Sequence, residues 1–323
     1  MSNDVLQFGF QKKCSTVQCT WAVQETISHY LRSGSEVYCC LLDFSKAFDK
    51  VNFEQLFRKL EERKIPPIIL RLILFIYLNQ TCFIRWNSVE SQTFHVRNGV
   101  RQGAILSPSL FCVYLDELFS KLKASGVECQ LGGLYLGAFG YADDVTLLAP
   151  SRQSLQMMLK ICEDFASSHS MLFSTDPTPA KSKAKCLFFS RSRASDEVAQ
   201  VELNGDFLPW VTTAKHLGNH LSTKLNLTFF SPESKTDLSC KRAIMFDKVH
   251  QILQQFGYMD PKLVVQLLSV YSTALYGSCL WQLNSKEQSL EHCYKDDLGP
   301  ASWYPYPIPG KLLPCSSSSV SFS

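Results

Sequence analysis

The sequence lacks the features of a membrane or secreted protein. No apolar stretch approaches the roughly 20 consecutive residues that a membrane-spanning helix requires. The start, MSNDVLQFGFQKKCS, lacks the apolar run of a secretory signal. The 13 cysteines include no C-x-x-C pair, which argues against a zinc finger and favours reduced thiols in the core. We therefore expect a soluble, intracellular protein with no membrane partner.

A strong charge bias is also missing. The chain has 32 Lys and Arg residues against 29 Asp and Glu residues, a formal net charge of +3. This balance is well below that of a dedicated nucleic-acid coat, so charge alone identifies no partner. No internal repeat is evident. With 323 residues and 46% hydrophobic content, the chain can bury a sizeable core.

Hydrophobic periodicity predicts a mixture of helices and strands. Helices are expected at 14–33, 45–64, 68–78, 106–125, 151–168 and 241–283, with 68–78 buried and the last interrupted at 257–261. Strands are expected at 37–44 and 181–189, in a hairpin pairing 81–86 with 93–96, and in a second hairpin within 134–149. This order favours an α+β fold with a small antiparallel sheet.

Acidic residues stand at the ends of two predicted strands. Asp43 ends the apolar run VYCCLLDF, and Asp143 and Asp144 lie at the tip of the second hairpin. Carboxylates are the ligands that Mg²⁺ prefers, and two such ions serve nucleotidyl transfer. Because adjacent strand residues point to opposite faces, we assign Asp143 to the metals beside Asp43 and a supporting role to Asp144. Helix capping and turn formation remain the alternatives, and Asp49 is expected to be a helix-start or surface charge.

A glycine-containing loop precedes the helix predicted at 106–125. In NGVRQGAILSP, from Asn98 to Pro108, two glycines allow close backbone approach. Arg101 and Gln102 supply donors for a phosphate or a base edge. A purely structural role for the loop stays open.

Three motifs in one order resemble the palm motifs of reverse transcriptases: LLDFSKAFDKV, NGVRQGAILSPSLF and GYADDVTLL. Their form is similar to the non-LTR (LINE-type) retrotransposon branch. QFGFQKKCST resembles the fingers segment of that branch and HLGNHLS its primer grip, so the resemblance covers roughly residues 7–283. It implies a right-hand polymerase with partial fingers at 1–36 and 52–98, palm at 37–51 and 99–230, thumb-like helices at 231–283, and a degenerate or disordered tail at 284–323.

The resemblance also implies roles for individual residues. Asp43 and Asp143 would hold two Mg²⁺ ions (Mn²⁺ being the alternative), with Asp144 as third acid and the backbone carbonyl of Phe44 as a further ligand. Phe48 would be the gate beneath the sugar, since a ring against C2′ leaves no room for a 2′-hydroxyl. The remaining implied contacts are Arg101, Gln102 and Gly103 with the incoming nucleotide, and Leu217 and Gly218 with the primer end.

A fourth motif is less regular. TPAKSKAKC resembles a segment that usually has Asn, then two residues, then Lys, and here Thr178 stands in place of Asn. The match implies that Lys181 protonates the departing pyrophosphate, as a positioned cation can. Lys183 and Lys185 could substitute, and a solvated basic face is the other interpretation.

The implied function is RNA-directed DNA polymerisation. Its implied partners are an RNA template, a DNA primer and deoxynucleoside triphosphates, and the sequence indicates no protein partner. The alternative is an inactive remnant that binds RNA or primer–template duplex; a group II maturase fits less well. In this family a fingers segment with a triphosphate-clamping arginine precedes QFGF, so we expect an amino-terminal truncation, and no endonuclease segment is found. The resemblance also implies that the protein acts in the nucleus, although no targeting signal is evident in the sequence.

Overall fold

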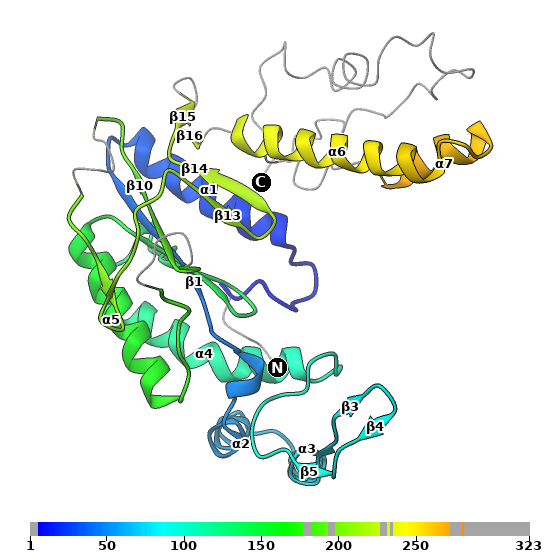
Figure 1. The fold of residues 1–323 in the computed structure, drawn as a ribbon. Helices are drawn as coiled ribbons and strands as arrows, with labels where there is room; N and C mark the ends of the chain where they lie inside the picture. The colour runs from blue at the N-terminus through cyan, green and yellow to red at the C-terminus, as the bar shows by residue number, and fades with distance from the viewer. Residues whose placement is uncertain are drawn as a thin grey trace, which may run out of the picture. The chain divides into compact units, whose positions relative to one another are not determined.

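The computed structural model describes residues 6–176, 182–192, 198–226, 231–232, 235–271 and 280 (Figure 1). All of them lie within residues 1–281, which form one compact unit. Lys181 and the tail predicted at 284–323 fall outside the described residues. The described part combines α-helices with antiparallel strands, which confirms the α+β prediction. None of its helices is both long and apolar enough to span a membrane.

A four-stranded antiparallel sheet organises the core, in the strand order β10–β1–β9–β8. The strands are β1 (Val37–Asp43), β8 (Ala138–Tyr141), β9 (Asp144–Ala149) and β10 (Lys185–Phe189). β1 lies between β9 and β10 and is buried along nearly its whole length. A strand with neighbours on both edges and both faces needs apolar side chains throughout, which explains the run VYCCLLD.

Three helices pack against this sheet: α1 (Thr16–Arg32), α4 (Ser107–Ser125) and α5 (Arg152–Ser168). α1 begins with a capping box, in which Ser15 and Gln18 satisfy each other's backbone N–H groups. The three ranges agree with the helices predicted from periodicity. These helices therefore hold the sheet, and with it the ends of β1 and β9, in a fixed frame.

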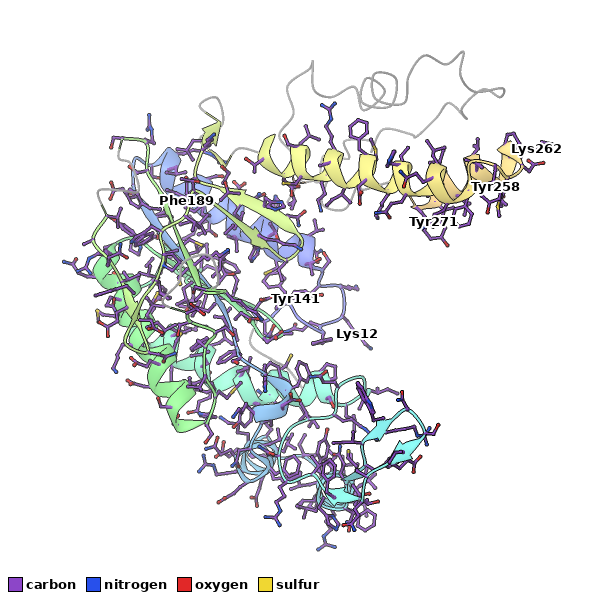
Figure 2. The ribbon with its side chains drawn as sticks, viewed as in Figure 1. Lys12, Tyr141, Phe189, Tyr258, Lys262 and Tyr271 are labelled. Carbon is purple, nitrogen blue, oxygen red and sulfur yellow. The ribbon has the colours of Figure 1, made fainter. Side chains whose placement is uncertain are left out.

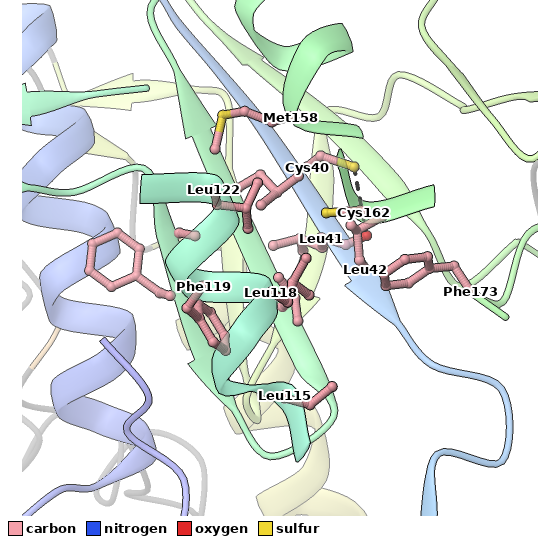
Figure 3. Packing of buried hydrophobic residues seen from close by; sticks show 14 of the residues in the cluster. Cys40, Leu41, Leu42, Leu115, Leu118, Phe119, Leu122, Met158, Cys162 and Phe173 are labelled. Atoms are coloured by element: carbon pink, nitrogen blue, oxygen red, sulfur yellow. Dashed lines mark hydrogen bonds between the residues drawn. The ribbon is translucent and has the colours of Figure 1, made fainter. Parts of the chain in front are cut away.

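The core between α4, α5 and β1 is continuous and contains buried thiols. Figure 3 shows side chains from the three elements gathered in one cluster, among them Leu118, Leu122, Cys40 and Cys162. The cysteines of the described residues are all free. The buried ones include Cys39, Cys40, Cys112 and Cys186, the four expected to act as core hydrophobes.

The region after β1 is helical and then forms two short hairpins. Its elements are α2 (Phe53–Glu62), α3 (Pro67–Leu78), the pair β2 (Thr81–Cys82) with β5 (Phe94–His95), and the pair β3 (Arg85–Trp86) with β4 (Val89–Glu90). The hairpin predicted between 81–86 and 93–96 is confirmed for Thr81–Cys82 with Phe94–His95, whereas Arg85–Trp86 pairs with Val89–Glu90 instead.

The expectation that the helix at 68–78 is buried was wrong. Within α3, Ile73 and Tyr77 are buried, whereas Ile68 is 76% and Phe75 67% exposed. The helix is apolar except for Arg71, but among the described residues it packs along one face only, mainly against α2. Composition predicted the helix, and the number of neighbours decided its burial.

The carboxyl-terminal part of the described chain contains short hairpins followed by two helices. The hairpins are β11 (Glu202–Leu203) with β12 (Asp206–Phe207), β13 (Thr213–His216) with β14 (Asn219–Ser222), and β15 (Leu225–Asn226) with β16 (Ser231–Pro232). β6 (Gln130–Leu131) and β7 (Leu134–Tyr135) form another, earlier in the chain. The helices are α6 (Lys235–Phe256) and α7 (Pro261–Tyr271), with Tyr258 in the turn between them (Figure 2). The predicted break at 257–261 is thus confirmed.

Candidate catalytic site

Asp43 and Asp144 face each other across two paired strands. Asp43 is the last residue of β1 and Asp144 the first of β9, and the antiparallel register pairs them directly. Directly opposed residues lie on the same face of a sheet, with Cβ atoms about 5 Å apart. The backbone carbonyl of Asp43 also accepts a hydrogen bond from Ser174 N–H at 2.8 Å. The fold therefore brings together two carboxylates that lie a hundred residues apart in the chain.

Asp143 joins this pair from the turn between β8 and β9. Burial raises the pKa of the Asp143 carboxyl, and the negative charge of Asp43 raises it further. Burial, together with the charges of Asp143 and Asp43, raises the pKa of Asp144 to about 6. The charge of Asp43 thus acts on both Asp143 and Asp144, and we call the three carboxylates the acidic cluster. The sequence led us to place Asp143 beside Asp43 at the metals, whereas the strand register places Asp144 directly opposite Asp43. The assignment of Asp143 as the principal ligand stays a prediction.

The acidic cluster suits a hard divalent cation. Its donors are carboxylate oxygens, and their mutual repulsion is what a cation would relieve. No three His, Cys, Asp or Glu side chains in the described part of the chain already stand in the arrangement of a protein-only metal cage. Mg²⁺ does not require one, because it is commonly held by one or two carboxylates together with water and substrate phosphates.

Phe44 is fixed beside the acidic cluster. Its backbone forms an isolated antiparallel bridge with Phe173. The two rings stack with centroids 4.2 Å apart. The carbonyl of Phe44 therefore belongs to a rigid segment, and its role as a metal ligand stays a prediction.

Lysines line the other side of the acidic cluster. A cavity of about 360 Å³ is bordered by Asp43 and Asp144 and by three lysines, Lys183, Lys185 and Lys215. Lys183 Nζ donates to Asp43 Oδ2 at 2.9 Å, which raises the pKa of Lys183. Its side chain is 67% exposed, so this ion pair contributes little to stability. Lys183 is the cation that the described residues bring to Asp43.

Phe48 is held by stacking. It opens the 3₁₀ helix η1 (Phe48–Lys50), and its ring stacks on Phe111 of α4 with centroids 4.7 Å apart and planes 15° apart. Phe111 is fully buried, whereas Phe48 is half-buried. The ring of Phe48 is thereby anchored on one face by the core.

The loop with Arg101, Gln102 and Gly103 follows η1 closely in space. Val100 N–H donates to the Phe48 carbonyl at 2.8 Å. Gly99 has φ +89°, and a Cβ there would lie 3.0 Å from the backbone of Asp49, so the position requires glycine. Arg101, Gln102 and Gly103 are all exposed. Phe48 and this loop are therefore neighbours in the fold, and their roles as sugar gate and nucleotide contacts stay predictions.

Leu217 and Gly218 form the two-residue turn of the β13–β14 hairpin. Both have positive φ, +47° and +85°, as a type I′ turn requires. Lys241 of α6 donates through Nζ to the Gly218 carbonyl at 2.7 Å. The predicted primer-grip residues therefore sit on a tight turn tied to a helix.

His216, which the sequence motifs did not single out, anchors this hairpin in the core. Its Nδ1 lies 3.0 Å from Thr20 Oγ1 of α1, and its Nε2 lies 3.0 Å from Thr146 Oγ1 of β9. Burial lowers the pKa of His216 to about 4. The imidazole is thus neutral in the folded protein and links the hairpin to the strand that carries Asp144.

We predict that His216 makes the protein less stable in mild acid. Between about pH 4 and pH 6.5 the unfolded chain binds a proton at this residue and the folded chain does not. The unfolding free energy should therefore fall as the pH drops through this window, by up to about 3 kcal/mol. Urea titrations at several pH values measure the loss, and His216→Gln, which cannot titrate, should remove this component. An identical slope in His216→Gln would contradict the prediction.

Comparisons with known proteins agree on one family. The sequence model described as "Reverse transcriptase (RNA-dependent DNA polymerase)" matches residues 1–221. A Pol polyprotein of the type-1 retrotransposable element R2 from Nasonia vitripennis is 32% identical over 127 residues, 39% of this chain and 12% of that protein. A probable RNA-directed DNA polymerase from transposon BS of Drosophila melanogaster is 27% identical over 293 residues, 87% of this chain and 30% of that protein.

The chain thus spans less than a third of the length of these relatives. Among solved structures, apo telomerase from Candida tropicalis aligns with a TM-score of 0.48 at 10% identity, covering 81% of this chain and 45% of that one.

Proposed function

The chain belongs to the reverse transcriptase (RNA-dependent DNA polymerase) family, and from this premise we propose that it adds deoxynucleotides to a primer 3′-hydroxyl on an RNA template. The relatives from R2 and BS elements confirm the resemblance to retrotransposon polymerases that the three motifs indicated. The observation that carries the proposal is the acidic cluster. Asp43 and Asp144 are in direct register and border a cavity that lysines line, and Asp143 is close enough for the charge of Asp43 to raise its pKa.

In this proposal the acidic cluster holds two Mg²⁺ ions. When bound, such ions lower the pKa of the attacking hydroxyl and neutralise the charge of the triphosphate. Asp43 and Asp143 would be the principal ligands, with the Phe44 carbonyl beside them and Asp144 in support. The rigid sheet keeps these oxygens in place before substrate arrives, which reduces the cost of organising them during the reaction.

Basic groups would handle the phosphates. Lys183 lies at the acidic cluster, and its positive charge can partly neutralise the negative charge that develops on the departing pyrophosphate. The proton donor predicted from the fourth motif, Lys181, lies two positions earlier in the sequence and outside the described residues, and it remains part of the proposal. Arg101 and Gln102, exposed on the loop after η1, would contact the incoming nucleotide.

Primer extension on a defined RNA template tests the function. The purified chain is given a DNA primer annealed to RNA, the four deoxynucleoside triphosphates and Mg²⁺, and should extend the primer by templated nucleotides. Chelation of the metal should stop extension, because the carboxylates alone cannot neutralise the triphosphate. Binding of the duplex without any incorporation would contradict the proposal and favour an inactive, duplex-binding remnant.

A further inference from the structure

The turn before the catalytic aspartates has an unusual backbone. Ala142 follows Tyr141 (labelled in Figure 2) and directly precedes Asp143, and it has φ +58°. This left-handed conformation brings Cβ close to the following carbonyl oxygen in any residue except glycine. It also sets the direction in which the chain leaves the turn, and so the direction of the carboxylates that follow. Some contact must hold Ala142 there.

That contact comes from Gln7, which is near the first of the described residues. The side-chain oxygen of Gln7, Oε1, accepts the Ala142 N–H at 3.2 Å, and its Nε2 lies 3.5 Å from the Ala142 carbonyl oxygen as donor. Oε1 also accepts the N–H of Gly9 at 3.0 Å. Gln7 is 1% exposed. A primary amide is suited to this position because it offers an acceptor and donors side by side, matching both polar groups of one peptide residue.

The backbone around Gln7 is docked as well. Phe8 N–H donates to the Gly140 carbonyl at 2.8 Å, and Gly140 N–H donates to the Leu6 carbonyl at 2.9 Å. Glycines permit this approach: a Cβ on Gly9 would lie 2.3 Å from Ala142 N, and one on Gly140 would lie 3.0 Å from Gln7 Nε2. We call Gln7, Gly9 and the backbone of Gly140 and Ala142 the clasp.

We infer that Gln7 is a positioning residue, which holds Ala142 in its left-handed conformation and thereby directs Asp143 and Asp144 toward Asp43. This inference rests on the proposed function. Because Gln7 is buried, its side chain would reach neither substrate nor metal. It acts on the turn that carries the carboxylates, in a site where small displacements of the reacting groups are costly.

The test exploits the freedom of glycine. Gln7→Met keeps the side-chain length and removes both polar contacts, and is expected to lower kcat about 10- to 100-fold. The KM for nucleotide should change less than about threefold, since binding groups are untouched. Adding Ala142→Gly to Gln7→Met should recover most of the lost kcat, because glycine adopts positive φ without strain. Gln92→Met, in an exposed loop, is the matched control.

A second readout does not depend on polymerase activity. In the metal-free protein, hydrogen exchange of the Ala142 amide should become at least about tenfold faster in Gln7→Met, because its acceptor is gone. If the chain does not polymerise, this measurement still decides whether the clasp exists. An unchanged exchange rate, or a loss of kcat as large with Ala142→Gly as without it, would overturn the inference. So would failure of both Gln7 variants to fold, which would make Gln7 a general core residue.

Discussion

Asp143→Asn is expected to reduce nucleotide addition at least about 1000-fold, equivalent to about 4 kcal/mol of lost transition-state stabilisation. Asparagine keeps the shape of the side chain but offers a neutral oxygen, which binds a hard divalent cation far more weakly. Asp144→Asn should have a smaller effect if Asp144 is the supporting acid. Pre-steady-state primer extension at saturating nucleotide measures both rates.

Asp143→Asn should also stabilise the metal-free protein near neutral pH. The pKa values of Asp143 and Asp144 are raised in the folded state, so the folded chain holds protons that the unfolded chain has lost. This costs stability progressively as the pH rises from about 4, the ordinary carboxyl value, toward 6, the value to which the pKa of Asp144 is raised. Removing the charge of Asp143 removes part of that cost, although the partial exposure of the Asp143 side chain limits the gain. Urea denaturation in the presence of a chelator measures it.

Asp49→Asn is the matched control for Asp143→Asn. Asp49 belongs to the same motif as Asp43, but its side chain is exposed on η1. The Asp49→Asn variant should retain activity and show no gain in stability. If Asp143→Asn polymerises as fast as the unmodified chain, the assignment of Asp143 to the metals is wrong. If Asp144→Asn loses more of the rate than Asp143→Asn, then Asp144 is the principal metal ligand and Asp143 the supporting acid.

Phe48→Val is expected to weaken the preference for deoxynucleotides over ribonucleotides by about 10- to 100-fold. The ring of Phe48 is stacked on Phe111 and cannot retreat from a substrate without disturbing the core. A ring fixed in this way excludes an added hydroxyl by steric contact, and the smaller valine leaves room for it. The ratio of kcat/KM for matched deoxy- and ribonucleoside triphosphates measures the change.

Phe57→Val separates selection of the sugar from stability. Phe57 packs against Phe53 and Tyr77 by edge-to-face ring contacts and lies on α2. The loss of its ring should lower the melting temperature and leave the sugar preference intact. Ribonucleotide rejection by Phe48→Val as strong as that of the unmodified chain would refute the gate assignment.

The sequence was informative where function and structure depend on local patterns. The continuous apolar run before Asp43 predicted a buried strand, and turn residues at Asp143 and Asp144 predicted a hairpin tip; both are confirmed. The meeting of these acids followed from the order of the motifs, because no local pattern encodes the pairing of β1 with β9. The predicted proton donor Lys181 lies outside the described residues, and its neighbour Lys183 is the lysine seen at Asp43.

Contacts between distant residues could not be predicted in this way. His216 bonds with Thr20, 196 residues away, and Gln7 with Ala142, 135 residues away. A single buried polar residue has no periodicity, and its partners depend on how the whole chain packs. The exposure of α3 was missed for a similar reason, since its apolar composition does not reveal how many neighbours it has.

The clasp also joins two segments that are synthesised at different times. Ala142 is translated 135 residues after its partner Gln7. During that interval Gln7 has no access to Ala142, and contacts between residues so distant in sequence form slowly. We therefore expect Asp143 and Asp144 to reach their final orientation only when Gln7 meets Ala142, late in folding.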